Sequence, residues 1–202
     1  MSVFVKICGF RNREAVEAAV DAGADALGFV FAPSPRHVSP EQARELCAGL
    51  PDTVLRVAVM HQPSPDEWLE VRRVFQPDWL QTDADDFAPL PVGDKVRPLP
   101  VYRDLGHLDE DAVAVQPLAL FEAGASGVGA RADWERAARL AARTDLILAG
   151  GLDPDNVANA IRQVRPWGVD VSSGVERKRG VKDLQKIIAF IDAAKAEGLH
   201  AH

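Results

Sequence analysis

The chain has 202 residues and a formal net charge of −7, and 47% of its residues are hydrophobic. This is ordinary globular composition and argues against intrinsic disorder. The acidic balance argues against a nucleic-acid partner, which usually meets a basic face, but one phosphate can still be held by backbone N–H groups. No apolar run approaches the roughly 20 residues that span a bilayer, so no membrane partner is expected.

The two cysteines, Cys8 and Cys47, are too few for a disulfide framework. Charged residues interrupt the first 14 positions, which argues against a signal peptide. We therefore expect a reducing, cytoplasmic setting. Cys47 falls inside a predicted helix and is interpreted as a small buried hydrophobe.

Eight short apolar runs alternate with helical stretches along the chain. Continuous apolar runs of this length are typical of strands buried on both faces of a parallel sheet. The expected strands are Val3–Cys8, Asp25–Phe31, Val54–Met60, Asp78–Thr82, Lys95–Val101, Ala114–Phe121, Asp145–Ala149 and Gly168–Val171.

The stretches between these strands carry helix signals, such as the Ser-Pro starts at Ser39 and Ser64. The expected helices are Asn12–Ala22, Ser39–Gly49, Ser64–Phe75, Asp133–Ala142, Asp153–Val164 and Lys182–Ala196. Helices after strands 4 and 5 are poorly supported, because Pro89 and Pro91 interrupt one connection and the other is short.

Alternating strands and helices imply parallel pairing, either in an open doubly wound sheet or in a closed (β/α)8 TIM barrel. Open sheets of that type usually have five or six strands, whereas eight units are present here. The sequence thus predicts a single compact (β/α)8 barrel domain over residues 1–202, with reduced helices after strands 4 and 5.

In such a barrel the functional site lies at the C-terminal ends of the strands. Gly150 and Gly151 follow strand 7, and Ser172, Ser173 and Gly174 follow strand 8. Residues without bulky side chains let backbone N–H groups approach an anion, although each segment alone could be a tight turn. Their occurrence at adjacent strand ends favours a phosphate site.

Two further strand ends carry groups suited to proton transfer. Cys8 ends strand 1, where it is either a core thiol or a reactive one, and the residues alone leave this open. Glu122 ends an apolar run, so partial burial would raise its pKa and keep it protonated as a general acid; alternatively it is a solvated loop carboxylate. Asp83 is the next rim carboxylate if Glu122 is not the acid.

Each of the charged residues near the strand ends has a functional and a structural interpretation. Arg36 could bind a substrate carboxylate or be an ordinary surface arginine. Lys6 and Asp170 become neighbours if the barrel closes, and their ion pair could be purely structural or could orient substrate or Cys8. The histidines show no metal-ligand spacing and no phosphate-binding lysine loop follows the glycines after strand 6, so neither a metal nor a nucleotide cofactor is predicted.

Several stretches together resemble the phosphoribosylanthranilate isomerases of tryptophan biosynthesis. They are Val5-Lys6-Ile7-Cys8-Gly9, the run from Ala22 to Phe31, Ser34-Pro35-Arg36, Ala149-Gly150-Gly151-Leu152, and the run from Val169 to Glu176. The resemblance implies an Amadori rearrangement of a phosphorylated aminoaldose without a cofactor. It also implies that Cys8 is the base, that the acid lies at Glu122, and that Arg36 binds the anthranilate carboxylate.

The same resemblance places Gln81 and Asp170 against the substrate and the two small-residue loops against its phosphate. The sequence departs from the family pattern in three places. Glu122 replaces an Asp, Asp83 stands where the family has a His, and the loop before Asp133 is shortened, with Ala130-Arg131-Ala132 in place of Lys-Thr-Phe. Another phosphosugar isomerase or epimerase, or a decayed relative that only binds a phosphorylated ligand, therefore remains an alternative. The sequence gives no prediction of oligomeric state.

Overall fold

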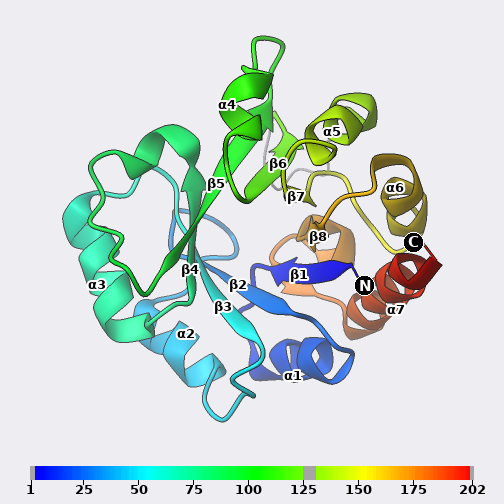
Figure 1. Cartoon of the computed structure of the whole chain (residues 1–202). Coiled ribbons are helices and arrows are strands. Elements are labelled where there is room, and N and C mark those ends of the chain that lie inside the picture. Colours follow the sequence, from blue (N-terminus) through cyan, green and yellow to red (C-terminus); the bar gives the residue numbers. More distant parts are fainter. Residues whose placement is uncertain (1–2, 125–130, 201–202) are drawn as a thin grey trace.

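Eight parallel strands close into a barrel (Figure 1) in the computed structural model, which describes residues 3–124 and 131–200. The strands are β1 (Phe4–Cys8), β2 (Ala26–Val30), β3 (Leu55–Val59), β4 (Trp79–Asp83), β5 (Arg97–Asp104), β6 (Ala119–Ala123), β7 (Leu146–Leu148) and β8 (Gly168–Val171). Because β1 pairs with β8, the sheet has no open edge. The barrel prediction is confirmed, and the doubly wound alternative is wrong.

Helices surround the barrel (Figure 1). They are α1 (Arg13–Asp21), α2 (Pro40–Leu46), α3 (Pro65–Phe75), α4 (Glu110–Ala114), α5 (Trp134–Ala141), α6 (Val157–Val164) and α7 (Leu184–His200). The connection after β4 holds only the 3-10 turn η1 (Ala84–Phe87), and the one after β5 holds the five-residue α4. The expected reduction of these two helices is confirmed. Ser39 and Ser64 both cap their helices ahead of a first-turn proline, as expected, and both also form capping boxes that were not predicted.

Three predicted boundaries are wrong for local reasons. Ala114 ends α4 instead of starting a strand, and β6 begins only at Ala119. The helix expected from Asp153 begins at Val157, because the Asp153 carboxylate accepts hydrogen bonds from the backbone N–H groups of Asp155 and Asn156 and stabilises a turn there.

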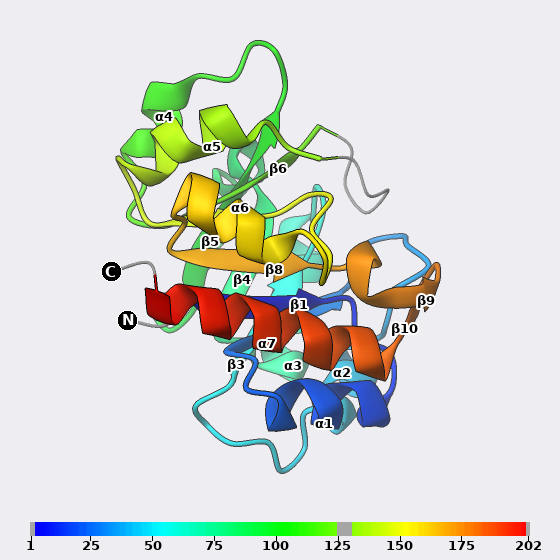
Figure 2. The same cartoon turned by 90° about the vertical axis from the view of Figure 1, so that its right-hand side faces the viewer.

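The third error is at Lys182, which was expected to begin the last helix. It ends a small antiparallel hairpin instead, formed by β9 (Glu176–Lys178) and β10 (Val181–Lys182). Figure 2 shows this hairpin at the end of the barrel toward which β1 and β8 point, with both chain termini at the opposite end. The hairpin escaped prediction because its strands are short and polar.

The barrel interior is filled by inward-facing apolar side chains from alternating strand positions, among them Ala26, Val57, Leu99, Leu120 and Ile147. At the N-terminal end of the strands, the ring of Phe4 stacks on Trp79 and Trp167, with centroids 5.4 and 4.6 Å apart. This packing closes that end of the barrel. The strand-end residues singled out in the sequence lie at the other end.

Continuing the alternation toward the C-terminal ends identifies the side chains that face the barrel mouth. Inward positions there are Cys8, Gly28, Gln81, Asp83, Arg103, Glu122, Ala149 and Asp170. The register places Cys8 opposite Gly28 and Arg103 opposite Glu122. Within the described part of the chain, no helix has the length and apolar character needed to cross a membrane.

Candidate active site

Cys8 lies at the barrel mouth beside a buried ion pair. The Nζ of Lys6 is 2.7 Å from the Oδ1 of Asp170 across the seam between β1 and β8. The predicted pair is therefore present. Strand alternation places Lys6 and Cys8 on the same side of β1, so the ammonium group faces both the carboxylate and the thiol.

Gly28 has no side chain, and the side chains of Cys8 and Lys6 occupy the space next to it. A Cβ on Gly28 would lie 3.0 Å from the Cys8 Sγ and 3.2 Å from the Lys6 Nζ, which is tighter than ordinary packing. A larger residue on β2 would therefore push the thiol or the ammonium group out of place. The sequence contained this glycine within the apolar run of strand 2, but gave no sign that it faces Cys8.

Burial and charge act in opposite directions on these groups. Burial raises the pKa of the Cys8 thiol above its ordinary value, and the Lys6 ammonium opposes that rise only in part. Burial alone would lower the pKa of Lys6, but the Asp170 carboxylate and Cys8 raise it, and the net shift is upward. Lys6 is therefore a fixed positive charge, able to stabilise a thiolate at Cys8.

Arg36 is buried and held by a residue that was not among the predicted site residues. Its Nε and Nη2 donate to the two carboxylate oxygens of Glu176 at 2.7 and 3.0 Å. The Nζ of Lys182 lies 3.2 Å from the same carboxylate. Arg36 is thus not a mobile surface arginine; one edge of its guanidinium is fixed by a bidentate ion pair. Glu176 ends the last stretch of the family resemblance, but nothing in the sequence signalled the role of Lys182.

Lys182 also joins this pair to the loop after β8. Its Nζ donates to the carbonyl oxygen of Ser172 at 2.8 Å, and the Ser172 hydroxyl donates to the carbonyl oxygen of Cys8 at 3.0 Å. Hydrogen bonds and ion pairs therefore run from Arg36 through Glu176 to the strand that carries the thiol. Shifting one of these groups would disturb the others.

The two small-residue loops lie against each other. Gly150 and Gly151 have φ values of 87° and 67°, a region that favours glycine. A Cβ on Gly174 would lie 2.0 Å from the carbonyl oxygen of Leu152, so only glycine allows this approach. The predicted phosphate-binding residues of β7 and β8 are thus adjacent, as a shared anion site requires.

Glu122 lies within β6, one residue beyond the predicted end of the strand, and its side chain is mostly buried. Its Oε1 accepts a hydrogen bond from Nη1 of Arg103 at 2.6 Å. The Nη2 of Arg103 donates to Asp83 Oδ1 at 2.6 Å. The first and second choices for the acid are therefore joined by one arginine. Arg103 was missed because strand 5 was ended at Val101; carrying the alternation of Leu99 and Val101 two residues further would have identified it.

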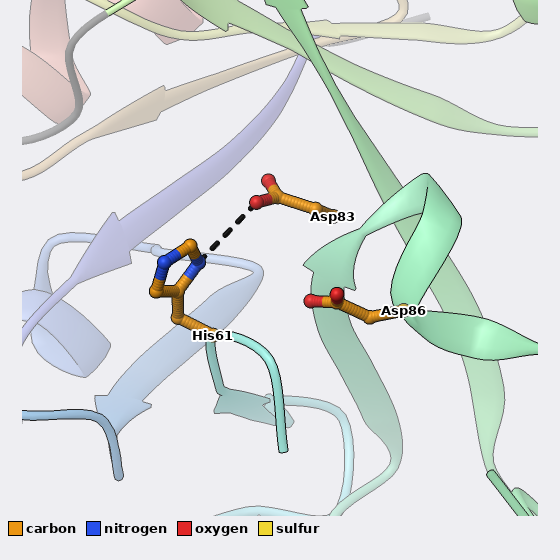
Figure 3. A group of neighbouring side chains, drawn as sticks. All are labelled: His61, Asp83 and Asp86. Carbon is orange, nitrogen blue, oxygen red and sulfur yellow. Dashed lines mark ion pairs between the residues drawn. The ribbon is translucent and has the colours of Figure 1, made fainter. Parts of the chain in front are cut away.

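Asp83 also belongs to a group of possible metal ligands that sequence spacing did not reveal. The side chains of His61, Asp83 and Asp86 point toward one another from three segments of the mouth (Figure 3), with ligand atoms within 4.8 Å. The Nδ1 of His61 lies 3.2 Å from Asp83 Oδ2, and Asp86 accepts hydrogen bonds from the Thr82 hydroxyl and the Gln62 N–H. Since Arg103 already supplies a cation to Asp83, these carboxylates have partners without a metal ion.

Gln81 faces the mouth between these groups and the barrel interior. It is 7% exposed, and no partner is recorded for its Oε1 among the described residues. A buried amide oxygen of this kind is costly unless a ligand donates to it, which agrees with the predicted contact to substrate. The shortened loop after β6, expected to alter the rim, lies largely in residues 125–130, outside the described residues.

The chain is similar in sequence to proteins of one family along nearly its whole length. A family model described as N-(5'phosphoribosyl)anthranilate (PRA) isomerase matches residues 5–193. A protein of Roseiflexus sp. (strain RS-1), named N-(5'-phosphoribosyl)anthranilate isomerase, is 44% identical, with 95% of this chain and 97% of that protein covered. A protein of the same name from Thiobacillus denitrificans is also 44% identical, with coverages of 97% and 100%.

Solved structures agree. Phosphoribosyl anthranilate isomerase from Thermotoga maritima superposes with a TM-score of 0.86 at 35% identity, covering 96% of this chain and 99% of that one. A phosphoribosyl anthranilate isomerase in complex with reduced 1-(o-carboxyphenylamino)-1-deoxyribulose 5-phosphate gives a TM-score of 0.83 at 35% identity and the same coverages. That relative binds a ligand with a carboxylate, a sugar-derived chain and a phosphate.

Proposed function

Because the chain belongs to the N-(5'-phosphoribosyl)anthranilate isomerase family, we propose that Cys8 and Glu122 carry out the proton transfers of this isomerisation at the barrel mouth. The chain is an isomerase of tryptophan biosynthesis that converts an aldose derivative to a ketose intramolecularly. The observation that carries the residue assignment is the shared mouth: both side chains take inward positions at strand ends, three strands apart around the closed barrel.

Two fixed cationic or polar regions would orient the substrate. The carboxylate of the anthranilate group binds Arg36, whose guanidinium is already held in place by Glu176. The phosphate binds backbone N–H groups of Gly150, Gly151, Ser172, Ser173 and Gly174. Gln81 and Asp170 lie between these ends and contact the sugar hydroxyls. Such two-ended binding places the reacting carbons near Cys8 and Glu122.

The reaction then needs only two proton transfers at the start and one tautomerisation. Protonated Glu122 gives its proton to the ring oxygen, the bond from that oxygen to C1 breaks, and the nitrogen lone pair forms a Schiff base. The Cys8 thiolate removes the proton from C2, and the electron pair moves to form an enolamine. The enolamine regains a proton at C1 and loses one from the C2 hydroxyl, giving the ketone. No external oxidant or cofactor enters the balance.

The Arg103 contact bears on the acid step. Glu122 must be protonated to act, whereas a guanidinium at 2.6 Å favours the carboxylate. Arg103 divides its single charge between Glu122 and Asp83, so the three groups carry a net charge of −1 when both carboxylates are ionised. Either carboxylate of this group can hold one proton, so the choice of Glu122 as the acid rests on its inward position at the end of β6.

The decisive test of the function is turnover of N-(5'-phosphoribosyl)anthranilate by the purified chain, together with rescue of a tryptophan-requiring strain that lacks this isomerase. We expect both. A well-folded protein that neither rescues growth nor forms the ketose would instead indicate another phosphosugar substrate or a binding protein without catalysis. The cytoplasmic setting stays a prediction, supported by the two unpaired thiols.

We also propose that residues 1–202 form one domain, because neither half of the chain contains both Cys8 and Glu122 with the two phosphate-binding loops. The pairing of β1 with β8 joins the first strand of the barrel to the last. A single cooperative unfolding transition is expected, with the same midpoint by fluorescence and by circular dichroism. Two separate transitions would contradict this organisation.

A further inference from the structure

Arg103 contacts both rim carboxylates, Asp83 of β4 and Glu122 of β6. It projects into the barrel mouth from β5, with its side chain 24% exposed. Its Nη1 lies 2.6 Å from Glu122 Oε1 and its Nη2 lies 2.6 Å from Asp83 Oδ1. Both contacts are short, charge-assisted hydrogen bonds, which are stronger and more directional than neutral ones.

Asp83, and not Glu122, sets the orientation of the Arg103 guanidinium. Asp83 anchors one of its nitrogens, and His61 lies against the other oxygen of Asp83 at 3.2 Å. An arginine fork is planar and rigid, so fixing one nitrogen also fixes where the other one points. The position of the second hydrogen bond, and with it the carboxyl group of Glu122, follows from this anchor.

Glu122 needs such a partner because its side chain is long. A glutamate has three rotatable side-chain bonds, and fixing it in one arrangement costs rotamer freedom. Catalytic groups misplaced by about 1 Å can lose about a hundredfold in rate. A glutamate at the strand end without a fixed partner would spend much of its time away from the productive position.

We propose that Arg103, anchored by Asp83, is a positioning residue that sets the place of the Glu122 carboxyl group for the isomerisation. This inference rests on the proposed function, since Glu122 is the general acid only in that reaction. Arg103 acts through Glu122 and does not itself transfer a proton. Substrate binding through Arg36 and the phosphate loops should therefore be independent of Arg103.

The test is steady-state kinetics of Arg103→Met with N-(5'-phosphoribosyl)anthranilate. We expect kcat to fall by about a hundredfold while KM changes little, because the acid is misplaced but both ends of the substrate still bind. Arg103→Lys should recover only part of the rate, since a lysine restores the charge but not the fork. A wild-type kcat in Arg103→Met would overturn the proposal.

Arg136→Met is a matched control. Arg136 has a similar exposure of 22% and also lies near two carboxylates, 2.7 Å from Asp104 and 3.5 Å from Glu110, but it is on α5 outside the mouth. Losing either arginine removes comparable surface ion pairs, so the loss of stability should be similar. Only Arg103→Met should lower kcat; an equal fall in Arg136→Met would show a general structural effect and overturn the assignment.

A double variant separates this inference from the proposed function. If Arg103 acts through Glu122, then Arg103→Met adds no further loss to Glu122→Gln; multiplying losses would overturn the positioning role. If Glu122→Gln alone keeps the wild-type kcat, the acid assignment itself fails. Should Arg103→Met not fold, Asp83→Asn removes the anchor instead: a lowered kcat that adds no further loss to Glu122→Gln supports the proposal, and a wild-type kcat or multiplying losses contradict it.

Discussion

Lys6 and Asp170 form a buried ion pair at the seam where β1 meets β8, with 2.7 Å between Nζ and Oδ1. The pair joins the first strand of the barrel to the last, and it places an ammonium group beside Cys8. One contact therefore joins the strands that close the barrel and also lies next to the proposed base. The structural interpretation and the functional interpretation that the sequence left open are both compatible with this position.

Removing one member of this pair should cost much stability. Lys6→Met leaves the Asp170 carboxylate buried without its partner, and breaking a buried pair in this way costs about 3–5 kcal/mol. The measurement is urea unfolding of the wild type and the variant. The double variant Lys6→Met/Asp170→Asn should regain part of the loss, since no uncompensated charge remains; a single variant as stable as the wild type would show that the pair contributes nothing.

Glu176→Gln should loosen the carboxylate-binding end of the site. The change leaves Arg36 and Lys182 buried near each other without their shared counter-charge, so we expect a loss of about 3 kcal/mol and a raised KM. The phosphate end should be affected less, so inhibition by inorganic phosphate should weaken less than substrate binding. Unchanged KM would mean that Arg36 is oriented by other contacts.

The same residue predicts an acid-dependent loss of stability. Burial would raise the pKa of Glu176, but Arg36, Lys182 and the Gly180 N–H group together hold it below its ordinary value. A lowered pKa gives stability that is complete above the unfolded-state pKa, about 4.3, and is lost as pH falls through the folded-state value. Unfolding measured from pH 6 to pH 3 should therefore show a shallower decline in Glu176→Gln than in the wild type.

Gly28→Ala should impair catalysis more than folding. The new methyl group would lie 3.0 Å from the Cys8 Sγ and so displace the thiol from its place beside Lys6. We expect kcat to fall by up to about tenfold with KM nearly constant, because the thiol must move by less than the roughly 1 Å that can cost about a hundredfold. Gly106→Ala is the control, as its Cβ would meet nothing within 4 Å; similar losses in both variants would argue against the role of Gly28.

The acid limb of the pH–rate profile should report Cys8. Burial raises the pKa of its thiol, so kcat/KM should increase with pH and have its midpoint above the ordinary thiol value of about 8.5. The Lys6 ammonium lowers that pKa and the Asp170 carboxylate raises it. Lys6→Met should therefore move the midpoint to higher pH and Asp170→Asn to lower pH. Shifts in the same direction for both variants would contradict this assignment.

Much of the fold followed from local patterns. The apolar strands and the Ser-Pro caps identified the alternating units, and the small residues after Ala149 and Val171 marked the two loops that lie against each other and are proposed to bind phosphate. These features are encoded by residues close together in the chain. The β9–β10 hairpin was missed, because its short polar strands have no periodic signal and it is stabilised by Glu176 and Lys182 from its two ends.

The partners of the predicted site residues were harder to foresee. Glu176 meets Arg36 across 140 positions, and Arg103 joins Asp83 to Glu122 from a strand that was ended too early. Glu122 and Asp83, which both depart from the family pattern, thus contact the same arginine. Such contacts depend on strand register and on which side chains face the mouth, and neither is specified by a motif.

Single-turnover kinetics of Cys8→Ala is the direct test of the Cys8 thiol as the base of the reaction. Cys47→Ala is the matched control: burial raises the pKa of that thiol to about 12, and it lies away from the mouth, so its loss should leave turnover unchanged. We expect Cys8→Ala to slow formation of the ketose by roughly 10²–10⁴-fold and to keep the affinity for phosphate. Formation of the ketose at the wild-type rate in folded Cys8→Ala would contradict it.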